Sequence, residues 1–559
     1  MKFSTKILSQ TLVQLCLDKG INHIVISPGS RNAPLTIGFG EHPEFQCFSV
    51  VDERCAAFFA LGMAQQLKKP VAVVCTSGSA LLNYYPAIAE AFYSDIPLVV
   101  LSADRPSDFI DIGDGQTIRQ ENVFENHILY SANCKEGEDF QVFNETEINI
   151  ALNTAFELNG PVHINIPFSE PLYKTTEQQL VWPQNVPPRL SSNTSKKILT
   201  EGNFNDFLNQ WNNSNRKMIL VGVLPPHSLE QRFVDYLAED ETVLVLTEAT
   251  SNIHHFNFIS AIDQLIAPLT EEDFKLLQPD ILLTFGGMIV SKKIKAFLRD
   301  FSPKSHWHVD PKKAYDTFFA LNHHFQTTIN HFCAEFFPKT KEVGSHYRNH
   351  WLRVKNHRLQ RHELYETQIP YSDFMVFCNI FHELPQNIQL QLSNSATIRY
   401  AQLFDISKTV EVFCNRGTSG IDGSTSTAVG AAYASQLPTV FLTGDLSFFY
   451  DSNGLWNNYI PKNFKIIVVN NGGGGIFRIL PGDKDSELFD TYFETKHNLG
   501  AKQLSEMYGF QYSAISEENG LGEKLNKFFN LNNGPALLEI FTPSTVNDGV
   551  LIEYFKFIS

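Results

Sequence analysis

The sequence predicts an α/β protein with three domains, each built around a parallel sheet. Short apolar runs alternate with longer helical patterns, which is typical of parallel α/β units. The 559 residues are enough for three or four units of about 150 residues each. Two polar stretches, 181–197 with three prolines and 338–345, are candidate linkers. We therefore expect domains over residues 1–182, 191–345 and 365–559.

The predicted strands form three groups along the chain, after an amphipathic helix in MKFSTKILSQTLVQLC. The first group comprises His23–Ile26, Val71–Cys75, Ile96–Ser102 and Val162–Ile166. The second comprises Met218–Val221, Thr242–Leu246, Asp280–Phe285 and His306–Val309. The third comprises Ile388–Leu392, Val410–Cys414, Thr439–Thr443, Lys465–Val469 and Ala536–Ile540. Because ligands of such sheets bind beyond the carboxyl ends of the strands, functional residues are expected in the loops that follow.

Composition narrows the class of protein. The balance of 44 Lys and Arg against 60 Asp and Glu gives a net charge of −16, which argues against a nucleic-acid or anionic-membrane binder. No run of 18 apolar residues occurs, so no membrane span is expected. The 8 cysteines contain no C-x-x-C, which argues against zinc and against a disulfide scaffold. A reducing compartment, the cytoplasm, is therefore expected.

The clearest chemical motif lies in the third group of strands. The apolar run TVFLT leads into Gly444-Asp445-Leu446, and 23 residues later the run KIIVV ends in Asn470-Asn471, followed by glycines 472–475. A carboxylate and an amide oxygen are hard ligands that suit Mg²⁺. A glycine-rich turn lets the backbone approach a phosphate. The pattern predicts a metal-anchored diphosphate, with two ordinary strand-end turns as the alternative.

The first group of strands offers a second candidate site. Glu53 opens a helix, CAAFFALGMAQ, that carries almost no charge, so its carboxylate should be poorly solvated and able to hydrogen-bond a heterocycle nitrogen. A simple interaction with the helix dipole is the alternative. The small-residue turn 76–80, followed by Asn83, would admit a flat ring.

Together, these two parts resemble the thiamin-diphosphate enzymes of the acetohydroxyacid synthase and pyruvate oxidase superfamily, over nearly the whole chain. The motif G-D-G…N-N is present with Leu446 in place of the third glycine. The resemblance implies a pyrimidine-binding domain, a central transhydrogenase-like domain and a diphosphate-binding domain, in that order. It also implies Mg²⁺ (or Mn²⁺) held by Asp445, Asn471 and the Gly473 carbonyl, and a homodimer or homotetramer with active sites between subunits.

Three longer sequence segments indicate a resemblance to one particular family within this superfamily. SPGSRNAPL, NRGTSGIDG and GDLSFFYDSNGL resemble the MenD family of menaquinone-pathway synthases, which decarboxylate 2-oxoglutarate and join the product to isochorismate. Both substrates are dicarboxylates, which arginine recognises bidentately. The resemblance assigns substrate contacts to Arg31, Arg105, Arg399 and Arg416, supported by Ser30, Gln116, Lys292 and Ser395. It assigns cofactor contacts to Glu53, Thr76, Asn83, Ile421, Gly444, Asp445, Leu446, Ser447, Asn471, Gly473, Ile476, Phe477 and Leu480.

Three other functions remain open from the sequence. One is another thiamin-diphosphate-dependent 2-oxoacid decarboxylase or carboligase, similar to acetohydroxyacid synthase, against which the number of strand-end arginines argues. A catalytically silent cofactor-binding scaffold is disfavoured by the joint presence of Glu53, Asp445 and Asn471. A nucleotide-binding oxidoreductase is disfavoured because no G-x-G-x-x-G follows a predicted strand.

Overall fold

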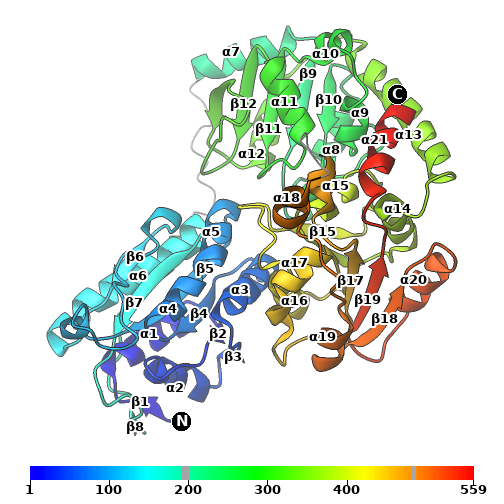
Figure 1. Cartoon of the computed structure of the whole chain (residues 1–559). Coiled ribbons are helices and arrows are strands. Elements are labelled where there is room, and N and C mark those ends of the chain that lie inside the picture. Colours follow the sequence, from blue (N-terminus) through cyan, green and yellow to red (C-terminus); the bar gives the residue numbers. More distant parts are fainter. Residues whose placement is uncertain (190–200, 480–485) are drawn as a thin grey trace.

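Three separate parallel sheets organise the chain in the computed structural model, which describes residues 1–189, 201–479 and 486–559. In Figure 1 the first sheet lies in the blue and cyan lobe, the central sheet in the green lobe and the third in the yellow-to-red lobe. A short antiparallel pair, β1 (Phe3–Ser4) and β8 (Thr175–Thr176), stands apart from them. Part of the predicted linker, residues 190–197, lies outside the described residues, and 181–189 form neither helix nor strand.

The first sheet has the order β3-β2-β4-β5-β7-β6. Its strands are β2 (His23–Ile26), β3 (Gln46–Ser49), β4 (Val71–Cys75), β5 (Leu98–Asp104), β6 (Ser131–Asn133) and β7 (Val162–Pro167). The accompanying helices are α1 (Ile7–Asp18), α2 (Ala33–Glu41), α3 (Glu53–Leu67), α4 (Ser79–Asn83), α5 (Tyr85–Ser94) and α6 (Gln141–Leu158).

The central sheet has the order β10-β9-β11-β12-β13. Its strands are β9 (Lys217–Val221), β10 (Val243–Leu246), β11 (Ile281–Phe285), β12 (Ser305–Val309) and β13 (Leu321–Phe325). Its helices are α7 (Glu201–Asn212), α8 (Gln231–Glu239), α9 (Ile262–Ile266), α10 (Glu271–Leu277), α11 (Lys292–Asp300) and α12 (Ile329–Phe336). The long helix α13 (Tyr347–Glu366) leads from this domain to the third.

The third sheet has the order β15-β14-β16-β17-β19-β18. Its strands are β14 (Gln389–Leu392), β15 (Glu411–Cys414), β16 (Thr439–Gly444), β17 (Phe464–Asn470), β18 (Gln511–Ile515) and β19 (Ala536–Phe541). Its helices are α14 (Asp373–Glu383), α15 (Ala396–Ala401), α16 (Ser424–Ala434), α17 (Asp445–Tyr450), α18 (Glu487–Phe489), α19 (Lys502–Met507), α20 (Leu521–Phe529) and α21 (Asn547–Phe557).

The first and third sheets share one topology. Numbered along the chain, the strands of both follow the order 2-1-3-4-6-5, and the central sheet follows 2-1-3-4-5. In each sheet the first and third strands are neighbours, and at this switch point a crevice opens beyond the carboxyl ends. In the central sheet this crevice is filled by backbone, since a Cβ at Gly222 would lie 2.0 Å from the Gly287 carbonyl oxygen. The switch points of the first and third sheets carry the predicted site residues.

Every strand predicted from the sequence is present, with ends within two residues of those expected. The sequence analysis missed the short pair β1 and β8 and four strands of the parallel sheets, β3, β6, β13 and β18, which all lie at the edges of their sheets. These four strands are partly exposed and largely polar and lack the continuous apolar run that marks an inner strand. The other two edge strands, β10 and β15, are apolar and mostly buried, and they were predicted. No helix in the described parts of the chain is long and apolar enough to cross a membrane.

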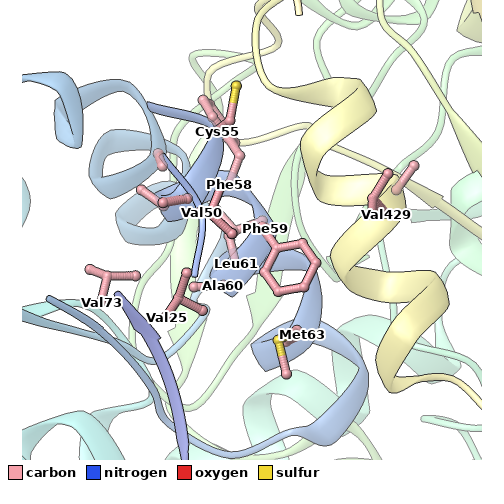
Figure 2. Close-up of a cluster of buried hydrophobic side chains, with 14 of the residues drawn as sticks. Val25, Val50, Cys55, Phe58, Phe59, Ala60, Leu61, Met63, Val73 and Val429 are labelled. Atoms are coloured by element: carbon pink, nitrogen blue, oxygen red, sulfur yellow. The ribbon is translucent and has the colours of Figure 1, made fainter. Parts of the chain in front are cut away.

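Helices α3 and α16 join the first domain to the third (Figure 1). Phe58, Phe59 and Met63 on α3 and Val429 on α16 belong to one buried apolar cluster (Figure 2). Two glycines let the backbones touch: a Cβ at Gly62 would lie 2.1 Å from the Thr427 carbonyl oxygen, and one at Gly430 would lie 2.0 Å from that of Phe59. Any side chain at either position would push the domains apart.

We predict that Gly430→Ala destabilises the protein by roughly 1–3 kcal/mol, the usual cost of overpacking, although alanine is the better helix former. The matched control is Gly549→Ala in α21, where a Cβ would meet no atom within 4 Å. That change should be neutral or should stabilise by up to about 1 kcal/mol. Urea denaturation of both variants checks the prediction; equal stability for Gly430→Ala and the parent would contradict the backbone contact.

Candidate active site

The Asp445 side chain connects the loops that follow the neighbouring strands β16 and β17. It is the first residue of α17, directly after β16, and its side chain is buried. Its Oδ1 accepts a hydrogen bond from the Leu446 N–H at 2.7 Å, and its Oδ2 accepts one from the Gly473 N–H at 3.0 Å. His497 Nε2 lies 3.3 Å from the same Oδ2. The carboxylate therefore stands in the crevice between β16 and β17.

Asn471, which follows β17, presents an oxygen that has no partner. Its Nδ2 donates to Asp373 Oδ2 at 2.8 Å, while its Oδ1 is buried without a hydrogen bond from any described residue. Burial, together with the charge of Asp445, raises the pKa of Asp373 to about 6. A buried polar atom without a partner is costly. The free amide oxygen next to two carboxylates fits a hard divalent cation such as Mg²⁺.

The glycine run after Asn471 needs glycine for backbone reasons. Gly472 has a φ of 76° and Gly473 a φ of 157°, and a Cβ at Gly473 would lie 2.7 Å from the Glu494 carbonyl oxygen. The Gly473 carbonyl accepts a hydrogen bond from the Gly475 N–H at 3.1 Å and keeps its second lone pair. It can therefore still act as a ligand.

The other residues of the third domain that are predicted to contact the cofactor lie in neighbouring loops or outside the described residues. Gly444 is the N-cap residue of α17, and the Ser447 hydroxyl donates to the Ile421 carbonyl at 2.8 Å, which holds the loop before α16. Ile476 and Phe477 lie on the 3-10 helix Gly475–Ile479. Leu480 lies outside the described residues.

Glu53 occupies the N-terminus of α3, after the N-cap residue Asp52. Its carboxylate is half-buried and accepts a hydrogen bond from Asn83 Nδ2 at 3.3 Å. Gly78, in the turn after β4, has a φ of 87°. The Thr76 hydroxyl accepts the Arg31 N–H at 3.2 Å and so links this turn to the loop after β2. The structure thus brings these residues together at the switch point of the first sheet.

Arg31 and Arg105 form the first arginine pair. Arg31 is 6% exposed, donates to the Phe168 carbonyl at 2.8 Å and lies 3.3 Å from Glu170. Burial lowers the pKa of Arg31, and the nearby Arg105 lowers it further. Arg105 donates to the Gly115 carbonyl at 3.1 Å. Exposed side chains of Ser30 and Gln116 line the rim of this pair.

Arg399 and Arg416 form the second pair, at the carboxyl edge of the third sheet. Arg416 donates to Asn394 Oδ1 at 2.6 Å, and the adjacent Ser395 has a φ of 69°. Burial lowers the pKa of Arg399, and Arg416 lowers it further. In all four arginines of the two pairs the Nε–H is buried without a partner among the described residues. Within each pair the two positive charges repel each other, and the Nε–H donors are free to form hydrogen bonds. This arrangement suits the binding of a carboxylate ligand.

The central domain brings two residues to the second pair that the sequence analysis missed. Glu248 is buried and accepts hydrogen bonds from the Val290 and Ser291 N–H groups at 2.7 and 2.8 Å. Burial raises the pKa of Glu248 to about 7. Lys295 is half-buried, and burial lowers its pKa while Glu248 raises it. The predicted Lys292 is exposed at the start of α11, whereas the charges of Arg416 and Arg399 act on Lys295 and help to lower its pKa.

A signal for Glu248 was present in the sequence, because it lies two residues after a predicted strand. Lys295 and His497 had no such signal, since one lies inside a helix and the other in a long connection after β17. Asp373 likewise precedes any strand of its domain and reaches Asn471 only in the folded chain.

Comparisons with known proteins agree with this geometry. Residues 7–128 match the N-terminal TPP binding domain of thiamine pyrophosphate enzymes, residues 176–392 the middle domain and residues 395–540 the C-terminal TPP binding domain. A 2-succinyl-5-enolpyruvyl-6-hydroxy-3-cyclohexene-1-carboxylate (SEPHCHC) synthase of Flavobacterium psychrophilum is 57% identical over 98% of both chains.

The chain belongs to the SEPHCHC synthase family of thiamine pyrophosphate enzymes.

Two further SEPHCHC synthases bear this out. That of Christiangramia forsetii is 56% identical over 100% of both chains, and one from Bacteroides fragilis is 38% identical over 97% of both. The predicted resemblance to this synthase family and the predicted three-domain α/β fold are confirmed. The exact domain boundaries and the roles of individual residues remain predictions.

We predict that the Glu248 carboxyl makes stability fall with rising pH. Its pKa is raised from 4.5 to about 7 by burial, so the folded state binds the proton more tightly than the unfolded state. This contribution is complete below about pH 4.5 and is lost as the pH rises through about 7. Thermal unfolding of Glu248→Gln should therefore improve relative to the parent as the pH is raised from 5 to 8.

The matched control is Glu272→Gln, at an exposed position on α10. Its melting temperature should run parallel to that of the parent over the same pH range. A Glu248→Gln curve that also runs parallel to the parent would contradict the buried-carboxyl interpretation.

Proposed function

We propose that this chain is a SEPHCHC synthase: it decarboxylates 2-oxoglutarate and adds the succinyl unit to isochorismate, giving SEPHCHC and CO₂ for menaquinone biosynthesis. Two pairs of arginines support this choice of substrates: Arg31 with Arg105, and Arg399 with Arg416. Each of the four has a buried Nε–H without a partner among the described residues. Bound thiamin diphosphate supplies the electron sink for the loss of CO₂.

Charge explains why the arginines are grouped. The chain has a net charge of −16, so a dianionic substrate must be attracted by local cations. In each pair, burial and the second guanidinium disfavour the charged form, and a carboxylate ligand relieves both effects. Bidentate contacts from planar guanidinium groups orient a substrate, which lowers the entropic barrier to reaction. Further substrate contacts would come from residues at the edges of the two arginine pairs: Ser30, Gln116, Ser395 and Lys292.

The residues present also fit the cofactor and its metal. Asp445 and Asn471 would bind Mg²⁺ (or Mn²⁺) through oxygen, with the Gly473 carbonyl as third ligand; the unpartnered Asn471 Oδ1 supports this. The Glu53 carboxylate, steadied by Asn83, would hold a proton at a nitrogen of the aminopyrimidine ring. Ile421, Ile476 and Phe477 would supply apolar contacts to the cofactor rings.

We further propose that the active form is a homo-oligomer in the cytoplasm, with Glu53 of one subunit facing Asp445 of another. Exposed apolar side chains flank both half-sites, which supports their burial against a second subunit. They are Val51 and Leu82 beside Glu53 and Asn83, Tyr450 at the end of α17, whose ring lies against Arg54, and Phe477 in the 3-10 helix after the glycine run. All eight cysteines are free, as suits a reducing compartment.

The proposed function predicts a strict two-substrate requirement. With thiamin diphosphate and Mg²⁺, the protein should consume 2-oxoglutarate rapidly only when isochorismate is present, and mass spectrometry should find the succinylated cyclohexene product. Arg416→Ala should lower kcat/KM at least tenfold, because a charge-assisted bidentate contact is lost. Turnover of pyruvate that is indifferent to isochorismate would assign the chain to the acetohydroxyacid synthase-like carboligases instead.

Mixing two inactive variants tests whether the active site is shared between subunits. Glu53→Gln should lower kcat by at least two orders of magnitude, the usual scale of proton-transfer catalysis. Asn471→Ala should also be inactive at moderate Mg²⁺, because it lacks a metal ligand. Co-expressed, the two variants should recover about a quarter of the parent activity, since half of the dimers are mixed and each mixed dimer has one intact site.

The control for Glu53→Gln is Glu44→Gln, an exposed carboxylate of the same domain that should keep full activity. Two outcomes would go against the proposal. Near-normal turnover of Glu53→Gln would remove Glu53 from the mechanism, and co-expression without recovery would place both half-sites in one subunit.

A further inference from the structure

Four metal-ligating side chains gather on two helices remote in sequence from the active-site loops. His362 and Glu366 are spaced i,i+4 on α13, and Cys378 and His382 are spaced i,i+4 on α14. This spacing places both members of a pair on one face of a helix. The loop between the helices folds the pairs together beside α21, on the outer flank of the molecule (Figure 1). No C-x-x-C motif marks such a site.

Glu366, Cys378 and His382 are close enough to share one ion. One potential ligand atom from each lies within 4.8 Å of those of the other two. Cys378 Sγ is 3.7 Å from His382 Nδ1, and His382 Nε2 is 3.7 Å from Glu366 Oε2. For a tetrahedral Zn²⁺ with ordinary bond lengths, sulfur and nitrogen ligands are separated by about 3.6 Å. These two contacts involve different ring nitrogens of His382, and an imidazole binds one ion through only one of them. The exposed His382 side chain must therefore shift to bring a single nitrogen to both Cys378 and Glu366, whose ligand atoms already lie within 4.8 Å of one of its nitrogens.

The surroundings of the cluster hold the carboxylate in place. His362 Nε2 lies 3.0 Å from Glu366 Oε1, and His362 Nδ1 lies 2.8 Å from the Tyr554 hydroxyl. Metal-binding carboxylates commonly have such hydrogen-bonded support. Cys378 is 6% exposed, whereas 64% of the His382 side chain is exposed. An ion can thus enter from the His382 side, where a water molecule can fill the fourth position.

We propose that Glu366, Cys378 and His382 form a binding site for Zn²⁺ or a similar borderline divalent ion. A thiolate and an imidazole select such ions, whereas Mg²⁺ and Ca²⁺ prefer oxygen ligands alone. On binding, the Cys378 thiol releases its proton to solvent and the thiolate coordinates the ion. The site joins the end of α13, which comes from the central domain, to the first helix of the third domain. An ion that binds only the folded chain stabilises that junction.

Co²⁺ titration tests the site, because a Co²⁺ ion shows a near-ultraviolet charge-transfer band only when a thiolate coordinates it. The protein is first saturated with thiamin diphosphate and Mg²⁺, so that the oxygen ligands of the active site are occupied. We expect one equivalent of Co²⁺ to bind with this band, and Zn²⁺ to displace it and raise the melting temperature. Cys378→Ser should abolish the band, and His382→Gln should weaken binding at least tenfold.

The matched control is Cys47→Ser, at a half-buried cysteine on β3, which should retain the band and the Zn²⁺ response. A parent protein without the band, or a band that survives Cys378→Ser, would overturn the proposal. If buried Cys378→Ser does not fold, the exposed His382→Gln decides alone: an unchanged Co²⁺ affinity in that variant would equally overturn it.

Discussion

The backbone contact between α3 and α16 is the constraint on which the arrangement of the domains depends. At Gly62 and Gly430 each helix lies so close to the other that no side chain fits between them. The contact is lined by one apolar cluster that runs from the first sheet to the third. Figure 2 shows the part of this cluster that lies between the first sheet and α16. Glu53 at the start of α3 and Ile421 just before α16 are therefore held by one rigid unit.

Repetition of one sheet topology explains where the functional groups lie. The first and third sheets share the order 2-1-3-4-6-5, so each has a crevice between its first and third strands. In the first sheet this crevice holds Arg31 and Thr76, and in the third it holds Asn394, while Asp445 follows the third strand and faces the loop after the fourth. The central domain has the same switch point, but Gly222 and Gly287 fill it with backbone. This domain contributes instead by packing Glu248 and Lys295 toward the arginines of the third sheet.

Several charged groups of the candidate site are buried, and burial shifts their pKa values. Glu248 and Asp373 are buried carboxyl groups whose pKa values burial raises to about 7 and 6. Buried arginines shift in the opposite direction, as expected when the charged form is desolvated. Such groups weaken the fold unless ligands or partners neutralise them, so their presence here supports the proposed binding of anions and a cation.

The sequence by itself determined the inner strands, the metal motif and the four arginines. Inner strands are continuous apolar runs, and the loops that follow them must meet at one edge of a parallel sheet, so Asp445, Asn471 and Arg416 could be found without coordinates. Only the tertiary structure decided the edge strands β3, β6, β13 and β18, the placement of Glu248 and Lys295, and the Glu366–Cys378–His382 cluster. These four edge strands lack the apolar signal because their side chains are partly exposed to solvent. The clusters depend on which helix faces meet, and packing between residues distant in sequence sets those contacts.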